Sequence, residues 1–188
     1  LSANIINGVT DVINKYGTVI VLEDDIVTSH HFLSFMNQAL NYYKNKQNVW
    51  HISGWNYSLN PKGLEDMFFW RVMNCWGWAT WRSAWETYDL DMKTWKNGDI
   101  KKNDLKYLSN KNYVLENYVG QFNEIIENRI ETWDIQWVYN CITHSGLCLT
   151  PAINMVSNIG VDGTHTSGEV TDSHFMETPD KKLTFEYS

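Results

Sequence analysis

Apolar side chains recur with two different periods at the start of the chain. Those between residues 5 and 16 fall on one helical face, and Gly17 follows where such a helix would end. Residues 18–22 are then a nearly uninterrupted β-branched and apolar run. Such a run is typical of a central strand in a parallel sheet, because that strand is buried on both faces. The pattern therefore predicts a helix followed by a buried strand.

The alternation continues after this strand. Ser29 is placed to cap an amphipathic helix that reaches about Lys44. Residues 49–53 predict the next strand, and Gly54 ends it. Helices and strands that alternate at such short intervals indicate the α/β class.

The middle of the chain has a less regular pattern. Residues 67–72 are apolar enough for a strand, whereas the Trp-rich residues 76–85 indicate a loop leading into a short helix. Residues 89–105 are polar and predict a surface connection.

Regular patterns return toward the C-terminus. Helical spacing covers residues 114–130 and again residues 133–144, and residues 147–151 predict a strand. Residues 158–170 are a Gly-rich loop. Because there is no internal repeat and no low-complexity linker, we expect residues 1–188 to belong to one domain.

The composition is that of a globular protein and limits its partners. Hydrophobic residues make up 43% of the chain and charged residues 20%. The net charge of −7 argues against nucleic acid as a partner, since phosphate backbones are bound by basic surfaces. No apolar run approaches the ~20 residues that span a bilayer, and no signal peptide is visible.

The start of the chain and its cysteines add two expectations. The chain begins with Leu1, inside a pattern that is already helical, so we expect a piece of a longer protein. A missing segment or a lipid-linked substrate would then allow peripheral membrane contact. The three cysteines form no CxxC pair, and their odd number fits reduced thiols better than a disulfide framework or a zinc site.

An acidic tripeptide, Glu23-Asp24-Asp25, directly follows the first predicted strand. Ligands of open parallel sheets bind at the carboxyl ends of strands, so these carboxylates would point into the binding crevice. Adjacent carboxylates repel one another, and Mg²⁺ or Mn²⁺ would relieve that repulsion while holding substrate phosphate. The alternative is a solvated acidic turn. The position straight after a strand favours the metal site.

Three segments together resemble a known enzyme family: VIVLEDDI (19–26), ISGWN (52–56) and CWGWATWRSAWE (75–86). They resemble bacterial nucleotide-sugar glycosyltransferases of the GT-A fold, related to family 2 and to the N-acetylglucosaminyltransferase I type. In that group Glu-Asp-Asp takes the place of the Asp-x-Asp motif. The resemblance covers residues 1 to about 167 and implies an α/β, Rossmann-like mixed sheet flanked by helices.

The resemblance also implies that part of the catalytic domain is missing. In that family the strands that hold the nucleotide base precede the first helix seen here, so the chain would be the C-terminal two-thirds of the domain. The whole protein is expected to be an enzyme, whereas these residues alone are not expected to turn over substrate. A sheet without its leading strands would carry an open edge, which favours self-association.

The resemblance assigns roles on the donor side. Asp25 would be the direct ligand of Mn²⁺ or Mg²⁺, Asp24 would lie against the ribose or a metal-bound water, and Glu23 would complete the network. The metal would bridge the diphosphate of a nucleotide-sugar, with UDP-sugars favoured, and act as a Lewis acid for the departing nucleoside diphosphate. His165 would approach the metal or the diphosphate; its alternative is a surface histidine without a ligand.

A second acidic segment surrounds Asp134, which stands just inside the start of a predicted helix between Trp133 and Trp137. An inverting transferase uses a carboxylate to take the proton from the attacking acceptor hydroxyl. From composition alone, the preference of acidic residues for helix N-termini is the better explanation of Asp134. In the resembling enzymes an acidic residue at this place is the usual base, so Asp134 is the first candidate and Glu131 the second.

Aromatic residues supply candidates for the acceptor site, because indole faces pack against sugar C–H surfaces. The candidates are Trp55, Asn56, Trp76, Trp78, Trp81 and Arg82. Burial in the core is the alternative for the tryptophans of residues 76–81, and we expect it for at least one of them. The resemblance implies that the acceptor is a glycan or a lipid-linked sugar in bacterial polysaccharide assembly, and that the protein works in the cytoplasm.

Two other function classes remain open at the level of sequence. A non-catalytic carbohydrate-binding module would use the Trp-rich segment for the sugar and the carboxylates for Ca²⁺, although Ca²⁺ takes roughly six to eight oxygen ligands. A metal-dependent phosphohydrolase would want a second ligand cluster for a two-metal site, and the sequence shows none. Of the transferase and the binding module, only the transferase requires Asp134.

Overall fold

The computed structural model describes residues 2–56, 65–160, 181–183 and 185. The elements in chain order are α1 (Ser2–Tyr16), β1 (Thr18–Val21), β2 (Ile26–Thr28), α2 (Phe32–Tyr43), β3 (Val49–Ser53), β4 (Met67–Trp70), β5 (Trp78–Trp81), α3 (Arg82–Trp85), α4 (Lys93–Lys96), the 3₁₀ helix η1 (Lys102–Tyr107), α5 (Asn112–Ile126), α6 (Asp134–Thr143), β6 (Leu147–Pro151) and β7 (Val156–Asn158).

The architecture is mixed α/β. Within the described residues, five strands form one sheet in the order β1-β5-β3-β6-β4. The pair β3–β6 is parallel, and the other neighbouring pairs are antiparallel. Strands β2 and β7 form a separate antiparallel ribbon. The α/β class predicted from the sequence is confirmed, with a mixed sheet.

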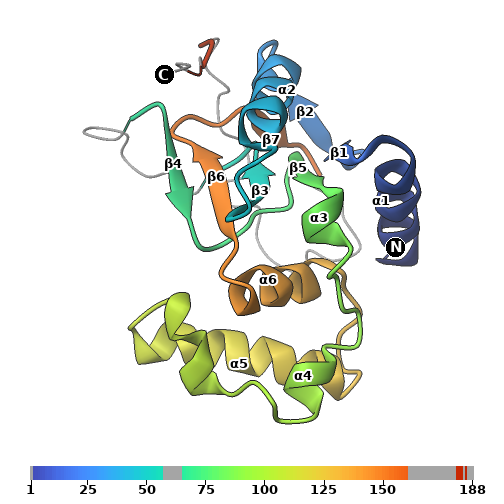
Figure 1. Ribbon diagram of the computed structural model, residues 1–188, viewed down its shortest axis with the longest axis vertical. Helices are drawn as coiled ribbons and strands as arrows, with labels where there is room; N and C mark the ends of the chain where they lie inside the picture. The colour runs from blue at the N-terminus through green and yellow to red at the C-terminus, as the bar shows by residue number, and fades with distance from the viewer. Residues whose placement is uncertain (1, 57–64, 161–180, 184, 186–188) are drawn as a thin grey trace.

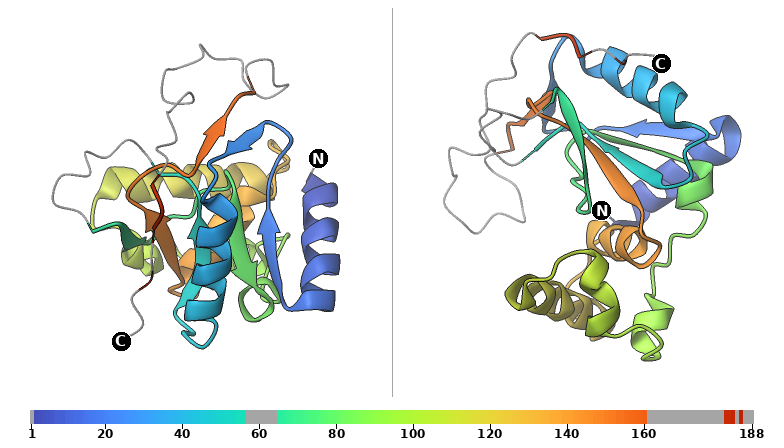
Figure 2. Two further views of the ribbon diagram at one scale, coloured as in Figure 1. Left: turned by 90° about the horizontal axis from the view of Figure 1, so that it is seen from above. Right: turned by 60° about the vertical axis from the view of Figure 1, so that its left-hand side comes forward.

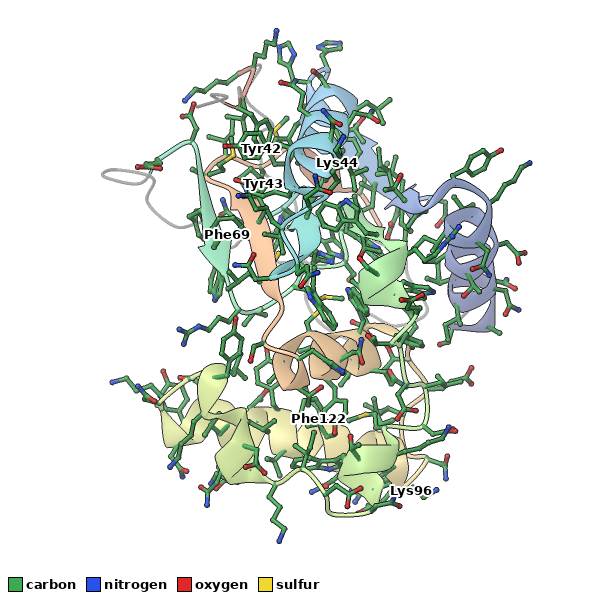
Figure 3. The ribbon with its side chains drawn as sticks, viewed as in Figure 1. Tyr42, Tyr43, Lys44, Phe69, Lys96 and Phe122 are labelled. Carbon is green, nitrogen blue, oxygen red and sulfur yellow. The ribbon has the colours of Figure 1, made fainter. Side chains whose placement is uncertain are left out.

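Helices lie on both faces of the sheet. Helix α2 covers one face, while α6 lies on the other side with α5 packed beyond it (Figures 1 and 2). One hydrophobic cluster fills the space between α2 and the sheet, and a second joins α1, α3 and α6 to the opposite face. A third lies between α5 and α6. There Phe122 points from α5 toward α6 (Figure 3), and its ring centroid is 5.1 Å from that of Tyr139.

Helix α1 confirms the first predicted element. Val9 and Ile13 are buried on its inner face. Gly17 ends the helix in a left-handed conformation (φ 82°), and its amide donates to the Ile13 carbonyl (2.8 Å). The following strand differs from the prediction. Among the described strands β1 pairs only with β5, so it is an antiparallel edge strand and not a central parallel one. Its apolar run is explained by α1, which covers one face of this edge.

The prediction for Ser29 is wrong. Helix α2 begins at Phe32, after His31, and no side chain caps it. Ser29 contributes its backbone instead: its carbonyl accepts from the Phe32 amide, and its amide donates to the Met155 carbonyl. The segment before α2 is therefore fixed by a contact with a distant part of the chain.

Two segments of the middle region are more ordered than predicted. Residues 78–81 form strand β5, and all four are buried, so the period of two that marks a half-exposed strand is missing. The short helix after this strand is confirmed as α3. Residues 89–105 contain α4 and the start of η1, and Met92 and Leu105 are fully buried. Their burial under α5 explains why this segment is more than a surface connection.

The predicted helices and strands near the C-terminus are confirmed as α5, α6 and β6, with bounds shifted by a few residues. The predicted loop 158–170 begins inside strand β7, and its residues 161–170 lie outside the described part of the chain. All three cysteines are free. Among the helices that the structure describes, none has the length and apolar character needed to cross a membrane.

Candidate active site

The acidic tripeptide forms the turn between β1 and β2. The Ile26 amide donates to the Glu23 carbonyl (3.2 Å), which closes the turn. Asp24 is exposed, whereas Glu23 and Asp25 are partly buried. The three carboxylates lie where the sequence predicts them, after the first strand, but in three different environments.

The β2–β7 ribbon holds Asp25. The Asn158 side-chain amide donates to Asp25 Oδ2 (3.2 Å), and the Ile159 amide donates to the Asp25 carbonyl (2.8 Å). A Cβ atom at position 160 would collide with Asp25 Oδ2, so Gly160 permits this close approach. The other oxygen, Asp25 Oδ1, is buried and has no hydrogen-bond partner among the described residues. One oxygen is thus fixed and the other remains available to a ligand.

Glu23 of the tripeptide and the segment around Asp134 line a single cavity of about 480 Å³, the carboxylate cavity, whereas Asp24 and Asp25 are not part of its described lining. Its lining consists of Ser2, Glu23, Cys75 and residues 130–135. Helix α1 and strand β1 run side by side in opposite directions, which brings the start of α1 to the end of β1 (Figure 2, left). The structure therefore gathers Glu23, Glu131 and Asp134 from segments that are far apart in the sequence.

The cavity is electrostatically negative. Burial is the main cause that raises the pKa of Glu23 above its ordinary value. The charges of Asp25, Asp134 and Asp24 raise that pKa further. Burial also raises the pKa of the Cys75 thiol well above its usual range, followed by the charges of Asp134 and Glu23. Since no Lys, Arg or His is part of the described lining, a cation or a proton donor is the ligand that this cavity would favour.

Local hydrogen bonds and packing position Asp134. It is the first residue of α6, and the Thr132 hydroxyl donates to its Oδ1. The Tyr88 hydroxyl donates to the Trp133 carbonyl (3.0 Å), directly before the helix. The Trp133 ring stacks on Trp78, with centroids 5.3 Å apart and an interplanar angle of 19°. These contacts hold the start of α6, and with it the Asp134 carboxylate, at the wall of the cavity.

The buried tryptophans predicted for the acceptor site, Trp55, Trp78 and Trp81, are not part of the described lining of this cavity. Trp78 is 0% exposed and Trp81 6%, and the Trp81 indole donates to the Leu40 carbonyl (3.1 Å). Trp55 and Asn56 are also buried. Because their rings and polar groups are enclosed by protein, these residues offer no open face to a sugar. They are core residues, which was the alternative for the tryptophans of residues 76–81.

The remaining candidates lie elsewhere. Trp76 is partly buried and packs edge-to-face on Trp55, with centroids 4.8 Å apart. The Arg82 guanidinium donates to the carbonyls of Ile13 (2.8 Å) and Asn14 (2.6 Å), so this side chain caps the C-terminal end of α1. His165 lies outside the described residues.

Several residues of the site were not among the predicted ones, including Thr132, Cys75, Ser2 and Tyr88. Thr132 could have been found, because a threonine two residues before a helix-opening Asp commonly makes local hydrogen bonds. Cys75 carried no pattern beyond that of a small buried residue. Ser2 and Tyr88 reach the site only through tertiary packing, and nothing in the sequence indicates them.

The comparisons with protein-family models and with curated proteins found no relative. No protein-family model matches the chain, and no curated protein matches it significantly. Within the described ranges, no group of three or more His, Cys, Asp or Glu side chains is arranged to hold a metal ion. The functional argument therefore depends on the residues and their geometry.

Proposed function

We propose that this chain is part of a metal-dependent glycosyltransferase of the GT-A fold. It would transfer a sugar from a nucleotide-sugar to a hydroxyl of a glycan or lipid-linked acceptor. The observation that carries the proposal is the convergence of Glu23 and Asp134 on one cavity. A donor site and a base are required within reach of each other in such an enzyme.

The donor set suits Mn²⁺ or Mg²⁺ bound together with a substrate phosphate. These ions use one or two protein carboxylates and take their other ligands from phosphate and water. Asp25 offers one buried oxygen that has no hydrogen-bond partner among the described residues, while the Asn158 amide donates to the other. When bound, the metal would supply Lewis-acid stabilisation of the departing nucleoside diphosphate. Glu23, whose charge is unfavourable in the cavity, would gain from the added positive charge.

Asp134 has the position of a general base. The acceptor oxygen would form a bond to the anomeric carbon of the donor, and its proton would pass to a carboxylate oxygen of Asp134. The bond between the anomeric carbon and the diphosphate oxygen would break, and that oxygen would keep the electron pair. Attack on the face opposite the leaving group gives inversion. Glu131, exposed on the same wall, is the second candidate for this role.

Calorimetric titration of UDP into the chain, with and without Mn²⁺, tests the donor site. We expect binding that requires both Mn²⁺ and Asp25, so that it is lost in Asp25→Ala. Asp11→Ala is the matched control, because Asp11 is an exposed carboxylate on α1 outside the cavity. Because the chain is proposed to be part of a larger enzyme, the same titration is made on the full-length protein. UDP binding that is absent from both, or unchanged without Mn²⁺ or Asp25, would contradict the proposal.

A further inference from the structure

A second cavity of about 480 Å³, the Gln136 cavity, adjoins the carboxylate cavity. Ser2 and residues 130–132 line both. The Gln136 cavity continues over the start of α1, the Leu90–Asp91 segment and the end of α5. Its volume lies within the roughly 300–1,000 Å³ of small-molecule sites. The two cavities thus share one wall, to which Glu131 and Thr132 belong.

An unpartnered polar group lines the second cavity. Gln136 is 4% exposed, and its Oε1 atom has no hydrogen-bond partner among the described residues. Buried polar atoms are nearly always hydrogen-bonded, so an exception in a cavity indicates a ligand that donates a hydrogen bond. Successive helix residues are about 100° apart, so Asp134 and Gln136 differ by about 200° around α6. This spacing explains why each side chain lines a different cavity.

The rest of the lining indicates the chemistry of that ligand. Asp91, Asn128 and Glu131 form an exposed polar rim with several acceptor oxygens. Ile6 and Ile125 contribute apolar surface. No Lys or Arg is part of this described lining, which disfavours phosphate and other anions. Hydroxyl donors combined with a C–H face are the properties of a neutral sugar.

We infer that the Gln136 cavity binds the acceptor sugar unit next to the one that is attacked. This inference rests on the proposed transferase function, since the attacked hydroxyl must lie at Asp134 in the carboxylate cavity. The shared wall of residues 130–132 lets one acceptor chain extend from one cavity into the other. The enzyme would therefore prefer an acceptor of at least two sugar units, and Gln136 would select for the second.

Ligand-observed NMR in the presence of Mg²⁺ and UDP tests this preference. The probes are methyl glycosides of glucose, galactose, mannose and N-acetylglucosamine, compared with cellobiose, lactose, mannobiose and diacetylchitobiose. We expect at least one disaccharide to bind about tenfold more tightly than the matching monosaccharide glycoside. Gln136→Met, which keeps the side-chain size but loses the acceptor oxygen, should remove that difference and leave UDP binding unchanged.

Two further variants make the result decisive. Asp91→Ala alters the exposed rim, where a substitution does not endanger folding. It should weaken binding of the disaccharide and leave binding of the monosaccharide glycoside unchanged. Gln38→Met on α2 lies outside both cavities and should have no effect. The inference is overturned if no saccharide binds, or if the disaccharide preference survives Gln136→Met and Asp91→Ala. UDP binding that does not depend on the metal and Asp25 would instead overturn the proposed function, so the two failures are distinguishable.

Discussion

The three carboxylates of the tripeptide differ because the turn gives each a separate environment. Asp25 is held by the β2–β7 ribbon, Glu23 faces the carboxylate cavity, and Asp24 remains in solvent. Like charges at adjacent positions are therefore tolerated by separation as well as by an expected cation. Two substitutions measure the consequences: Glu23→Gln changes the stability of the fold, and Asp134→Asn changes catalysis.

Replacing Glu23 by Gln should stabilise the fold at neutral pH. The pKa of Glu23 is raised in the folded state, chiefly by burial, so this side chain favours folding most below its unfolded pKa of 4.5. That contribution is lost as the pH rises through the folded pKa. The gain in Glu23→Gln should therefore grow from about pH 4 to about pH 8, and stay below about 1 kcal/mol because the group is partly exposed.

Urea unfolding at both pH values measures this gain. Asp11→Asn, at an exposed position of α1, is the control and should show no comparable growth with pH. A gain in Glu23→Gln that shrinks toward pH 8 would contradict the electrostatic description of the cavity.

Asp134→Asn should separate binding from chemistry. An amide cannot take the acceptor proton, so turnover by the full-length protein should fall by about 10²- to 10⁴-fold. The affinity for UDP with Mn²⁺ should stay within about twofold, because Asp134 is not assigned to the donor. UDP release from a panel of UDP-sugars measures turnover, and Glu131→Gln is the matched carboxylate control. Equal losses in both variants, or full activity of Asp134→Asn, would exclude Asp134 as the sole base.

At the scale of elements, Arg82 links α1 to the start of α3. Its guanidinium donates to two carbonyls at the end of α1. Arg82→Met should therefore lower the free energy of unfolding by about 1 kcal/mol and leave saccharide and UDP binding unchanged. Chemical unfolding and the NMR panel above measure both effects, with Arg129→Met as an exposed control. A selective loss of saccharide binding would restore Arg82 to the acceptor site.

The contact between Gly54 and Gly77 holds the end of β3 next to the start of β5. The Gly54 amide donates to the Gly77 carbonyl (2.6 Å), and a Cβ atom at Gly54 would lie 2.7 Å from that oxygen and 2.8 Å from Phe32. Gly54→Ala should destabilise the fold by about 1–3 kcal/mol through overpacking. Gly8→Ala, in open space within α1, should instead stabilise it by about 0.5–1 kcal/mol. Thermal unfolding of the pair measures the contrast, and similar shifts in both would refute the close approach.

The sequence predicted elements better where burial is one-sided. Helices α1 and α5 have an exposed polar face, and their spacing located them within a few residues. Strand β5 was not predicted, because all four of its residues are buried and show no alternation. Strand β1 was predicted to be central because its residues are apolar, but it lies at the edge of the described sheet and α1 covers one of its faces. Ser29 does not cap α2, because the helix begins three residues later, at Phe32. Local patterns contain no information on such long-range packing.

At the scale of the whole molecule, the candidate site depends on how α1, β1 and α6 meet. The acidic residues Glu23, Glu131 and Asp134 were identifiable from the sequence, but their shared cavity was not, because it is created by tertiary packing. The tryptophans gave the opposite outcome: their abundance suggested a sugar platform, and several are core residues that support α6 and the sheet. Residue types thus indicated the chemistry, while the fold determined which residues can perform it.

The central claim is that the tripeptide and Asp134 form one site around a metal–nucleotide complex. Paramagnetic broadening of assigned amide signals by substoichiometric Mn²⁺ in the presence of UDP tests this claim most directly. The signals of Asp25 and Asp134 should broaden together, before that of Gln38 on α2, and Asp25→Ala should abolish the effect. Broadening near Asp25 that leaves Asp134 unchanged, or broadening that is equal in Asp25→Ala, would contradict the account.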